Sequence, residues 1–195
     1  MAVIAGVDEA GRGPWAGPVV VAAVILPAVW DLPHLNDSKK LTEKRRAILF
    51  DQIIQHAHAY AWQFIQVPMI DRLNILRATL FGMQRAVAKL PVQPDSVLID
   101  GRDTPALPMP AQAIIGGDAS EPAIAAASIV AKVMRDRYMI RLGTRYPEYG
   151  FAAHKGYGTA AHQRALREYG VLMHHRKSYA PVKKVLHANS VVESV

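Results

Sequence analysis

The sequence predicts an α/β protein with a mixed five-stranded sheet flanked by helices and a helical C-terminal extension. Three apolar runs of strand length come first in the chain, which is typical of an antiparallel meander. Two more such runs alternate with long helical segments, which indicates crossover connections and parallel pairing. The chain has 195 residues, 51% of them hydrophobic, enough for one core with a small appendage.

The expected strands are apolar and bounded by turn residues. They span residues 2–7, 19–26, 59–67, 96–99 and 111–115. Helices are expected at residues 42–58, 73–90, 119–142 and 159–169. Thr42 is the expected N-cap of the first helix, and Gly170 ends the last. The second helix has apolar residues at spacings of three and four, which makes it the clearest amphipathic helix in the sequence.

Basic residues are concentrated in the C-terminal third. Residues 132–187 contain twelve Lys and Arg against three acidic residues, whereas residues 1–131 contain eleven against twelve. A basic face attracts polyanions, nucleic acid above all, although a solvated surface that keeps the protein soluble explains it equally well. We therefore expect residues 1–142 to form a catalytic core, residues 143–185 a basic helical extension and residues 186–195 a flexible tail.

The composition excludes several classes of protein. Cysteine is absent, which excludes a disulfide framework, a thiolate zinc site and a cysteine nucleophile. The uncharged stretch of residues 13–30 contains three prolines and is too short and broken to span a membrane. Asp8 and Glu9 come too early for a secretory signal, so we expect a soluble, cytoplasmic protein.

Four carboxylates fall at the ends of expected strands. Asp8 and Glu9 follow the first, Asp100 follows the fourth, and Asp118 lies just past the fifth. Each alone is a turn residue or a helix cap, but ligands bind at the carboxyl ends of strands in open α/β sheets. Four acids at one edge require a compensating positive charge, and oxygen-only ligands favour Mg²⁺ or Mn²⁺. Two such ions would support phosphoryl transfer.

Three loops carry residues suited to phosphate or sugar contacts. They contain Gly11, Arg12 and Gly13; Ser38 and Lys39; and Tyr157 between two glycines. Glycines let a backbone approach a phosphate, and a tyrosine can stack on a nucleotide and test for a ribose 2′-OH. A tight strand connection, a charged helix entry and a turn-anchoring tyrosine are the respective alternatives. Residues 174–178 (HHRKS) are a further phosphate-contacting candidate.

Several segments make the sequence similar to one known family. They are GVDEAGRGP (6–14), LNDSKKL (35–41), VLIDG (97–101), GDA (117–119), AAASI (125–129) with Ala131, Lys132, Arg135 and Asp136, KGYGT (155–159) and RKSYAPV (176–182). In this order they resemble the bacterial ribonuclease HII family, the type 2 ribonucleases H. The resemblance covers residues 3–185 and implies the ribonuclease H-like fold. One departure is Gly116, where many relatives carry lysine.

The resemblance also implies site roles and a reaction. The metal-binding and catalytic residues would be Asp8, Glu9, Asp100 and Asp118, with two Mg²⁺ or Mn²⁺ ions. The substrate-binding residues would be Gly11, Arg12, Gly13, Ser38, Lys39, Tyr157, Arg176 and Ser178. The implied reaction cleaves the phosphodiester on the 5′ side of a ribonucleotide and leaves a 3′-hydroxyl and a 5′-phosphate. Its substrates would be RNA–DNA hybrids and duplex DNA with embedded ribonucleotides, linking the enzyme to ribonucleotide excision and primer removal.

Two rival functions remain open at this point. A resolvase-like DNA nuclease of the same fold would use the same acids and basic face, but it has no need of a residue that tests a 2′-OH. A catalytically silent hybrid-binding protein would not need all four acids. We expect a monomer, and the tail shows no glutamine-and-aromatic pattern of a sliding-clamp peptide.

Overall fold

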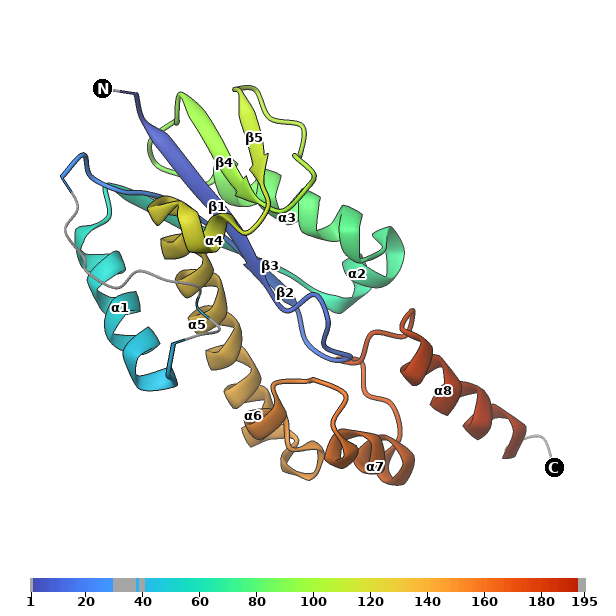
Figure 1. Ribbon diagram of the computed structural model, residues 1–195. Helices are drawn as coiled ribbons and strands as arrows, with labels where there is room; N and C mark the ends of the chain where they lie inside the picture. The colour runs from blue at the N-terminus through green and yellow to red at the C-terminus, as the bar shows by residue number, and fades with distance from the viewer. Residues whose placement is uncertain (1, 30–37, 39–40, 193–195) are drawn as a thin grey trace.

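The computed structural model describes residues 2–29, 38 and 41–192 and has a five-stranded sheet with helices on both faces (Figure 1). The strands are β1 (Ile4–Ala10), β2 (Val19–Ile25), β3 (Ala59–Ile65), β4 (Ser96–Asp100) and β5 (Ala111–Ile114), in the spatial order β3-β2-β1-β4-β5. The first three strands pair antiparallel, and β4 and β5 continue the sheet in parallel from β1. The predicted mixed sheet is confirmed.

Strand β1 is longer than the sequence predicted. We expected it to end at Val7, but its ladder with β2 continues to the pair of Ala10 with Val20. Asp8 and Glu9 therefore lie inside the central strand and not after it. The polarity of these two residues suggested a strand end, but the backbone hydrogen bonds to β2 keep the segment extended.

The helices are α1 (Glu43–His56), α2 (Val67–Leu73), α3 (Ile75–Ala88), α4 (Gly117–Ser120), α5 (Pro122–Arg145), α6 (Phe151–His154), α7 (Ala160–Tyr169) and α8 (Ala180–Val192). Thr42 caps α1, since its hydroxyl accepts a hydrogen bond from the Arg45 backbone N–H at 3.2 Å. Helix α2 was not predicted, because Pro68 was interpreted as a strand end although it occupies the first turn of this helix.

The core has one layer on each face of the sheet. Helices α2 and α3 contact one face, and α1 and α5 contact the other. The alanine-rich first half of α5 packs closely on β1. The approach is so close that a Cβ at Gly6 would lie 2.1 Å from the Ala123 carbonyl carbon. Helix α5 is thereby fixed directly behind the acidic strand.

Helices α6 and α7 pack around a third apolar cluster at the far end of α5 (Figure 1). Helix α5 continues to Arg145 and so crosses the boundary expected at residue 142. Helix α8 continues to Val192, whereas the sequence analysis expected a flexible tail from Leu186. Within the described residues, no helix is both long and apolar enough to cross a membrane.

Candidate active site

Three of the four predicted carboxylates lie close together on neighbouring strands. Parallel pairing of β1 with β4 sets Val7 beside Ile99, so Asp8 and Asp100 occupy the next positions of the two strands. Asp8 is buried, with 4% of its surface exposed. Burial, followed by the charges of Glu9 and Asp100, raises the pKa of Asp8 well above its usual value. Asp8, Glu9 and Asp100, which we call the acidic edge, therefore hold like charges close together, and Arg12 pairs with one of them, Glu9, at 3.4 Å.

Hydrogen bonds fix the orientation of Asp8. Its Oδ1 accepts from the Glu9 backbone N–H at 2.6 Å, and the Ser128 hydroxyl on α5 donates to its carboxylate. The Ser128 oxygen lies 2.7 Å from the Ser38 hydroxyl. Either of these two hydroxyls can be the donor in this pair. Ser38 is buried and supports the acidic edge from behind.

Asp118 comes from a helix and not from a strand. It is buried in the first turn of the short helix α4, whose N-cap residue Gly116 has a φ of 70°. Helix α4 contacts β4, the strand that ends in Asp100. Among the described residues, however, no three His, Asp or Glu side chains are placed closely enough to form a complete ligand set. The convergence of all four acids on one site therefore stays a prediction.

The acids nevertheless have the chemistry of a divalent-cation site. Asp100 Oδ1 is buried and has no hydrogen-bond partner in the described structure. An unpartnered buried carboxylate oxygen is costly unless a cation binds it. Carboxylates without sulfur ligands suit Mg²⁺ or Mn²⁺, so the residues present fit such ions.

A cavity of about 220 Å³ joins the acidic strand to the predicted substrate loops. Its lining consists of Glu9, Ala10, Gly11, Arg12, Gly13, Ser38, Lys132, Arg135 and Tyr157. Lys132 and Arg135 belong to the family pattern, but no site role was predicted for them. Their spacing of three residues on a helix that begins near the acids was the available signal.

Two buried arginines, Arg135 and Arg176, hold the glycine loop, residues 11–18. A Cβ at Gly11, whose φ is 95°, would lie 1.9 Å from the Arg135 Nε, so only glycine fits there. Arg135 donates from Nε to the Pro18 carbonyl at 3.1 Å. Burial, and then the charge of Arg176, lowers its pKa to about 10, so it stays charged at neutral pH.

Arg176 has a different role from the one predicted. We expected it to bind substrate, but its side chain is fully buried. Its guanidinium donates to the carbonyls of Gly11 at 2.6 Å, Arg12 at 2.7 Å and Gly17 at 2.9 Å. The planar fork of an arginine suits several carbonyls at once, so Arg176 supports the loop from within and does not face a phosphate.

Tyr157 is the exposed aromatic residue of this cavity. Its side chain is 48% exposed, and its Cε1 would lie 3.7 Å from a Cβ placed on Gly13. The turn that carries it packs against the glycine loop, because the Trp15 backbone N–H donates to the Gly156 carbonyl at 2.9 Å. Gly158 permits this contact, since a Cβ there would lie 2.1 Å from the Trp15 ring.

Ser178, another predicted substrate contact, lies elsewhere. The Ser178 hydroxyl donates to the Asp71 carboxylate at 2.5 Å, outside the lining of the 220 Å³ cavity. A phosphate would have to compete with Asp71 for this hydroxyl. Lys39 lies outside the described residues.

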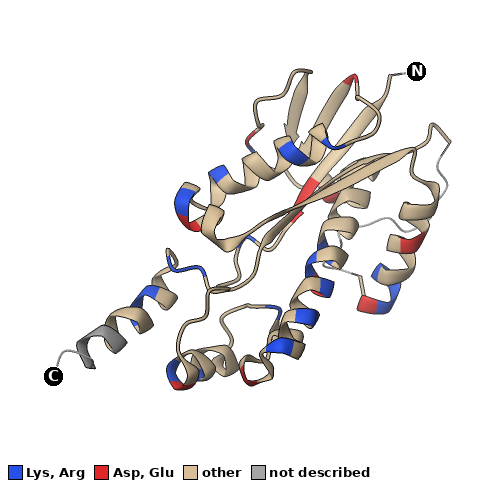
Figure 2. Cartoon of the chain, turned by 180° about the vertical axis from the view of Figure 1, so that it is seen from behind, with Lys and Arg blue, Asp and Glu red and all other residues tan. Residues whose placement is uncertain are grey.

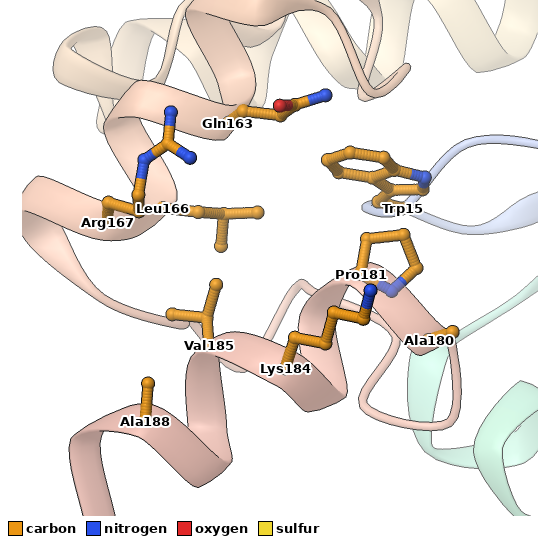
Figure 3. A pocket seen from close by; sticks show the side chains of 9 residues that line it. All are labelled: Trp15, Gln163, Leu166, Arg167, Ala180, Pro181, Lys184, Val185 and Ala188. Carbon is orange, nitrogen blue, oxygen red and sulfur yellow. The ribbon is translucent and has the colours of Figure 1, made fainter.

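A larger cavity of about 500 Å³ lies on the other side of Trp15, between α7 and α8 (Figure 3). Leu166 and Val185 point toward each other across it, and Arg167 and Lys184 stand at its sides. No acidic residue is part of its described lining. It therefore does not supply ligands for a divalent cation.

Buried acids on the central strands, a basic cavity and this sheet topology define a metal-dependent nuclease with the ribonuclease H-like fold. Comparison with known proteins agrees, because the family model for ribonuclease HII matches residues 5–182. The chain is 59% identical over 187 residues to the ribonuclease HII of Dichelobacter nodosus, covering 96% of this chain and 99% of the relative. It belongs to the ribonuclease HII family and is a metal-dependent endoribonuclease.

Further relatives and solved structures support this assignment. Ribonuclease HII of Coxiella burnetii is 55% identical over 183 residues, covering 94% of this chain and 91% of the relative. The crystal structure of ribonuclease H2 from Pyrococcus horikoshii superposes with a TM-score of 0.79 at 25% identity, covering 95% and 97% of the two chains. The Mn²⁺ complex of Bst-RNase HIII shares the fold, with a TM-score of 0.74 at 22% identity, covering 96% and 70%.

Proposed function

We propose that this ribonuclease HII cleaves the phosphodiester on the 5′ side of a ribonucleotide, in RNA–DNA hybrids and at single ribonucleotides within duplex DNA. The products carry a 3′-hydroxyl and a 5′-phosphate. One observation supports this most directly: Tyr157, the glycine loop and Glu9 line the same cavity. Tyr157, which can contact a ribose, thus lines the same cavity as Glu9, one of the proposed catalytic acids.

The acids Asp8, Glu9, Asp100 and Asp118 would hold two Mg²⁺ or Mn²⁺ ions. Such ions, when bound, activate a water and stabilise the departing 3′ oxygen. The protein's contribution is to fix the carboxylates, and the hydrogen bonds from Ser128 and the Glu9 backbone do this for Asp8. Burial excludes competing water from the same edge.

Tyr157 and the loop from Gly11 to Gly13 would recognise the ribose. The loop offers backbone N–H groups to the phosphate, and the tyrosine packs on the sugar and contacts the 2′-OH. Arg176 holds the Gly11 carbonyl and Arg135 the Ala16 carbonyl from behind, which leaves the opposite face of the loop toward the cavity. Lys132 also lines the cavity, where its ammonium donates to Asp136 at 2.7 Å.

The basic helices would hold the rest of the duplex. Figure 2 shows Lys and Arg distributed along α5 and on α7 and α8. Contacts of this kind are made to phosphates and are independent of sequence.

The test uses an end-labelled DNA duplex with one embedded ribonucleotide, with Mg²⁺, with EDTA and with Asp118→Asn. Metal-dependent cleavage on the 5′ side, lost in the variant, is the expected result. Cleavage of long hybrids alone would refute the role of Tyr157 and leave the metal site intact. Binding without cleavage of either substrate would make the protein a hybrid-binding protein, and cleavage of all-DNA junctions would make it a resolvase.

A further inference from the structure

Two fully buried histidines lie between the turn that carries Tyr157 and the segment that carries Arg176. His162 is in the first turn of α7, and His175 directly precedes Arg176. Their Nε2 atoms are 3.0 Å apart, within hydrogen-bond distance. Neither residue was given a positioning role by the sequence pattern, and neither lines the cavity with the acids.

The partners of each ring determine which nitrogen carries the proton. Nδ1 of His175 accepts from the Leu172 backbone N–H at 2.9 Å, so the proton of His175 is on Nε2. Nδ1 of His162 lies 2.9 Å from the Tyr157 carbonyl oxygen, which can only accept, so His162 is protonated on Nδ1. Nε2 of His162 is then the acceptor for the Nε2–H of His175. Both rings are neutral, and the hydrogen bonds run in one direction from Leu172 to Tyr157.

We propose that His162 and His175 are positioning residues that hold Tyr157 in register with the glycine loop for ribonucleotide recognition. The proposal rests on the function proposed above for Tyr157. One end of this histidine relay bonds the Tyr157 backbone directly. The other end belongs to the segment whose next residue, Arg176, binds the carbonyls of Gly11 and Arg12. A group that tests the sugar and a loop that binds the phosphate are therefore connected through two side chains.

The surroundings keep the relay in its neutral form. Aromatic rings enclose it, with Trp15 at 5.6 Å, Phe151 at 5.5 Å and His154 at 4.6 Å from the His162 ring centre. Burial lowers the pKa of His162 to about 4 and that of His175 to about 3. The hydrogen-bond direction derived above is therefore maintained at neutral pH, where the reaction would take place.

The proposal is tested by a double-mutant cycle on kcat/KM with the single-ribonucleotide duplex. We expect Tyr157→Ala to lower kcat/KM by roughly 10- to 100-fold, because stacking and the 2′-OH contact are lost. His162→Phe, which removes the donor to the Tyr157 carbonyl, should lower it about tenfold. The double variant should be no slower than Tyr157→Ala alone, since His162 acts through Tyr157. His162→Asn keeps a donor near the position of Nδ1 and should retain more activity than His162→Phe.

The controls separate positioning from folding. His56→Phe makes the same substitution at an exposed position on α1 and should keep wild-type activity. If His162→Phe does not fold, the same cycle is run with His162→Asn, and the same non-additivity is expected. Multiplication of the two single losses in the double variant would overturn the relay, as would a fully active His162→Phe beside an impaired Tyr157→Ala. Full activity of Tyr157→Ala would instead refute the proposed function of Tyr157 and the relay with it.

Discussion

Buried polar groups are balanced differently at the acidic edge of the sheet and in the loop cluster, the segments that carry Gly11, Tyr157 and Arg176. At the edge, like charges are held together, so the pKa of Asp8 rises and Asp100 Oδ1 stays without a hydrogen bond. In the loop cluster, the buried cation Arg176 meets backbone carbonyls, and His162 meets His175. The acids of the first region need a cation from solution to balance their charge, whereas the polar groups of the second are hydrogen-bonded within the chain. The stability of the first region should therefore depend on bound divalent cations, and that of the second should not.

The largest expected effect comes from neutralising the acidic edge. Asp8→Asn should lower kcat on the order of 10³-fold, because a central metal ligand is lost. In the absence of divalent cations, the same change should raise the free energy of unfolding, since it removes a buried charge repelled by Glu9 and Asp100. Activity assays and urea denaturation of the metal-free protein measure the two effects. Asp103→Asn, at an exposed position, is the control, and a loss of stability in Asp8→Asn would contradict our account of the edge.

The next largest effect should come from removing Arg176, the buried hydrogen-bond donor of the loop cluster. Arg176→Ala should lower the free energy of unfolding by about 3 kcal/mol, because the carbonyls of Gly11, Arg12 and Gly17 lose a buried donor. Arg176→Lys should recover little, since an ammonium does not have the planar fork. Thermal and urea unfolding check this, with the exposed neighbour substitution Lys177→Ala as the matched control. If Arg176→Ala lost duplex binding but no stability, the residue would be a substrate contact after all.

Acidification should weaken the loop cluster specifically. His162 and His175 have folded pKa values of about 4 and about 3, below the ordinary histidine value, so the unfolded chain binds more protons as pH falls below about 6.5. Their contribution is fully present above that pH and is lost toward pH 4, by roughly 1 to 2 kcal/mol between pH 7 and pH 5 after allowance for screening.

This pH effect is best measured in the Asp8→Asn background. The raised pKa of Asp8 acts in the opposite direction, because protonating this carboxylate stabilises the folded state. Urea unfolding of Asp8→Asn at pH 7 and pH 5, with and without His162→Phe, isolates the histidine contribution. An unchanged pH dependence on removing His162 would show that the histidines are not the cause.

The smallest effect should come from the basic surface shared by the two regions. Raising salt from about 50 to about 200 mM should lower kcat/KM about tenfold or more, since each phosphate contact releases counterions. Steady-state assays below saturation at several salt concentrations provide the slope, and Lys132→Gln should make it shallower. A flat salt dependence would show that the basic helices do not hold the duplex.

The sequence was informative where local pattern decides structure. The apolar runs located the five strands, and Asp100 ends β4 as the pattern predicted. Pro68 and Asp8 were misjudged as strand ends, because a helix start and the pairing of a central strand depend on tertiary contacts that local pattern does not encode. The burial of Arg176 was not predictable, since its acceptors are about 160 residues away in the chain. The position of Ser128 behind Asp8 likewise depends on the packing of α5 on the sheet.

Helix α5 connects the two regions as one continuous element of 24 residues. Ser128 near its start bonds Asp8, Arg135 in its middle holds the glycine loop, and Met139 reaches the C-terminal cluster. Each residue of an α-helix advances the chain by about 1.5 Å and turns it by about 100°. An insertion or deletion within α5 would therefore shift the C-terminal cluster out of phase with the acids. The pitch of a single helix thus fixes the spacing between the acidic strand and the elements that pack around the far end of that helix.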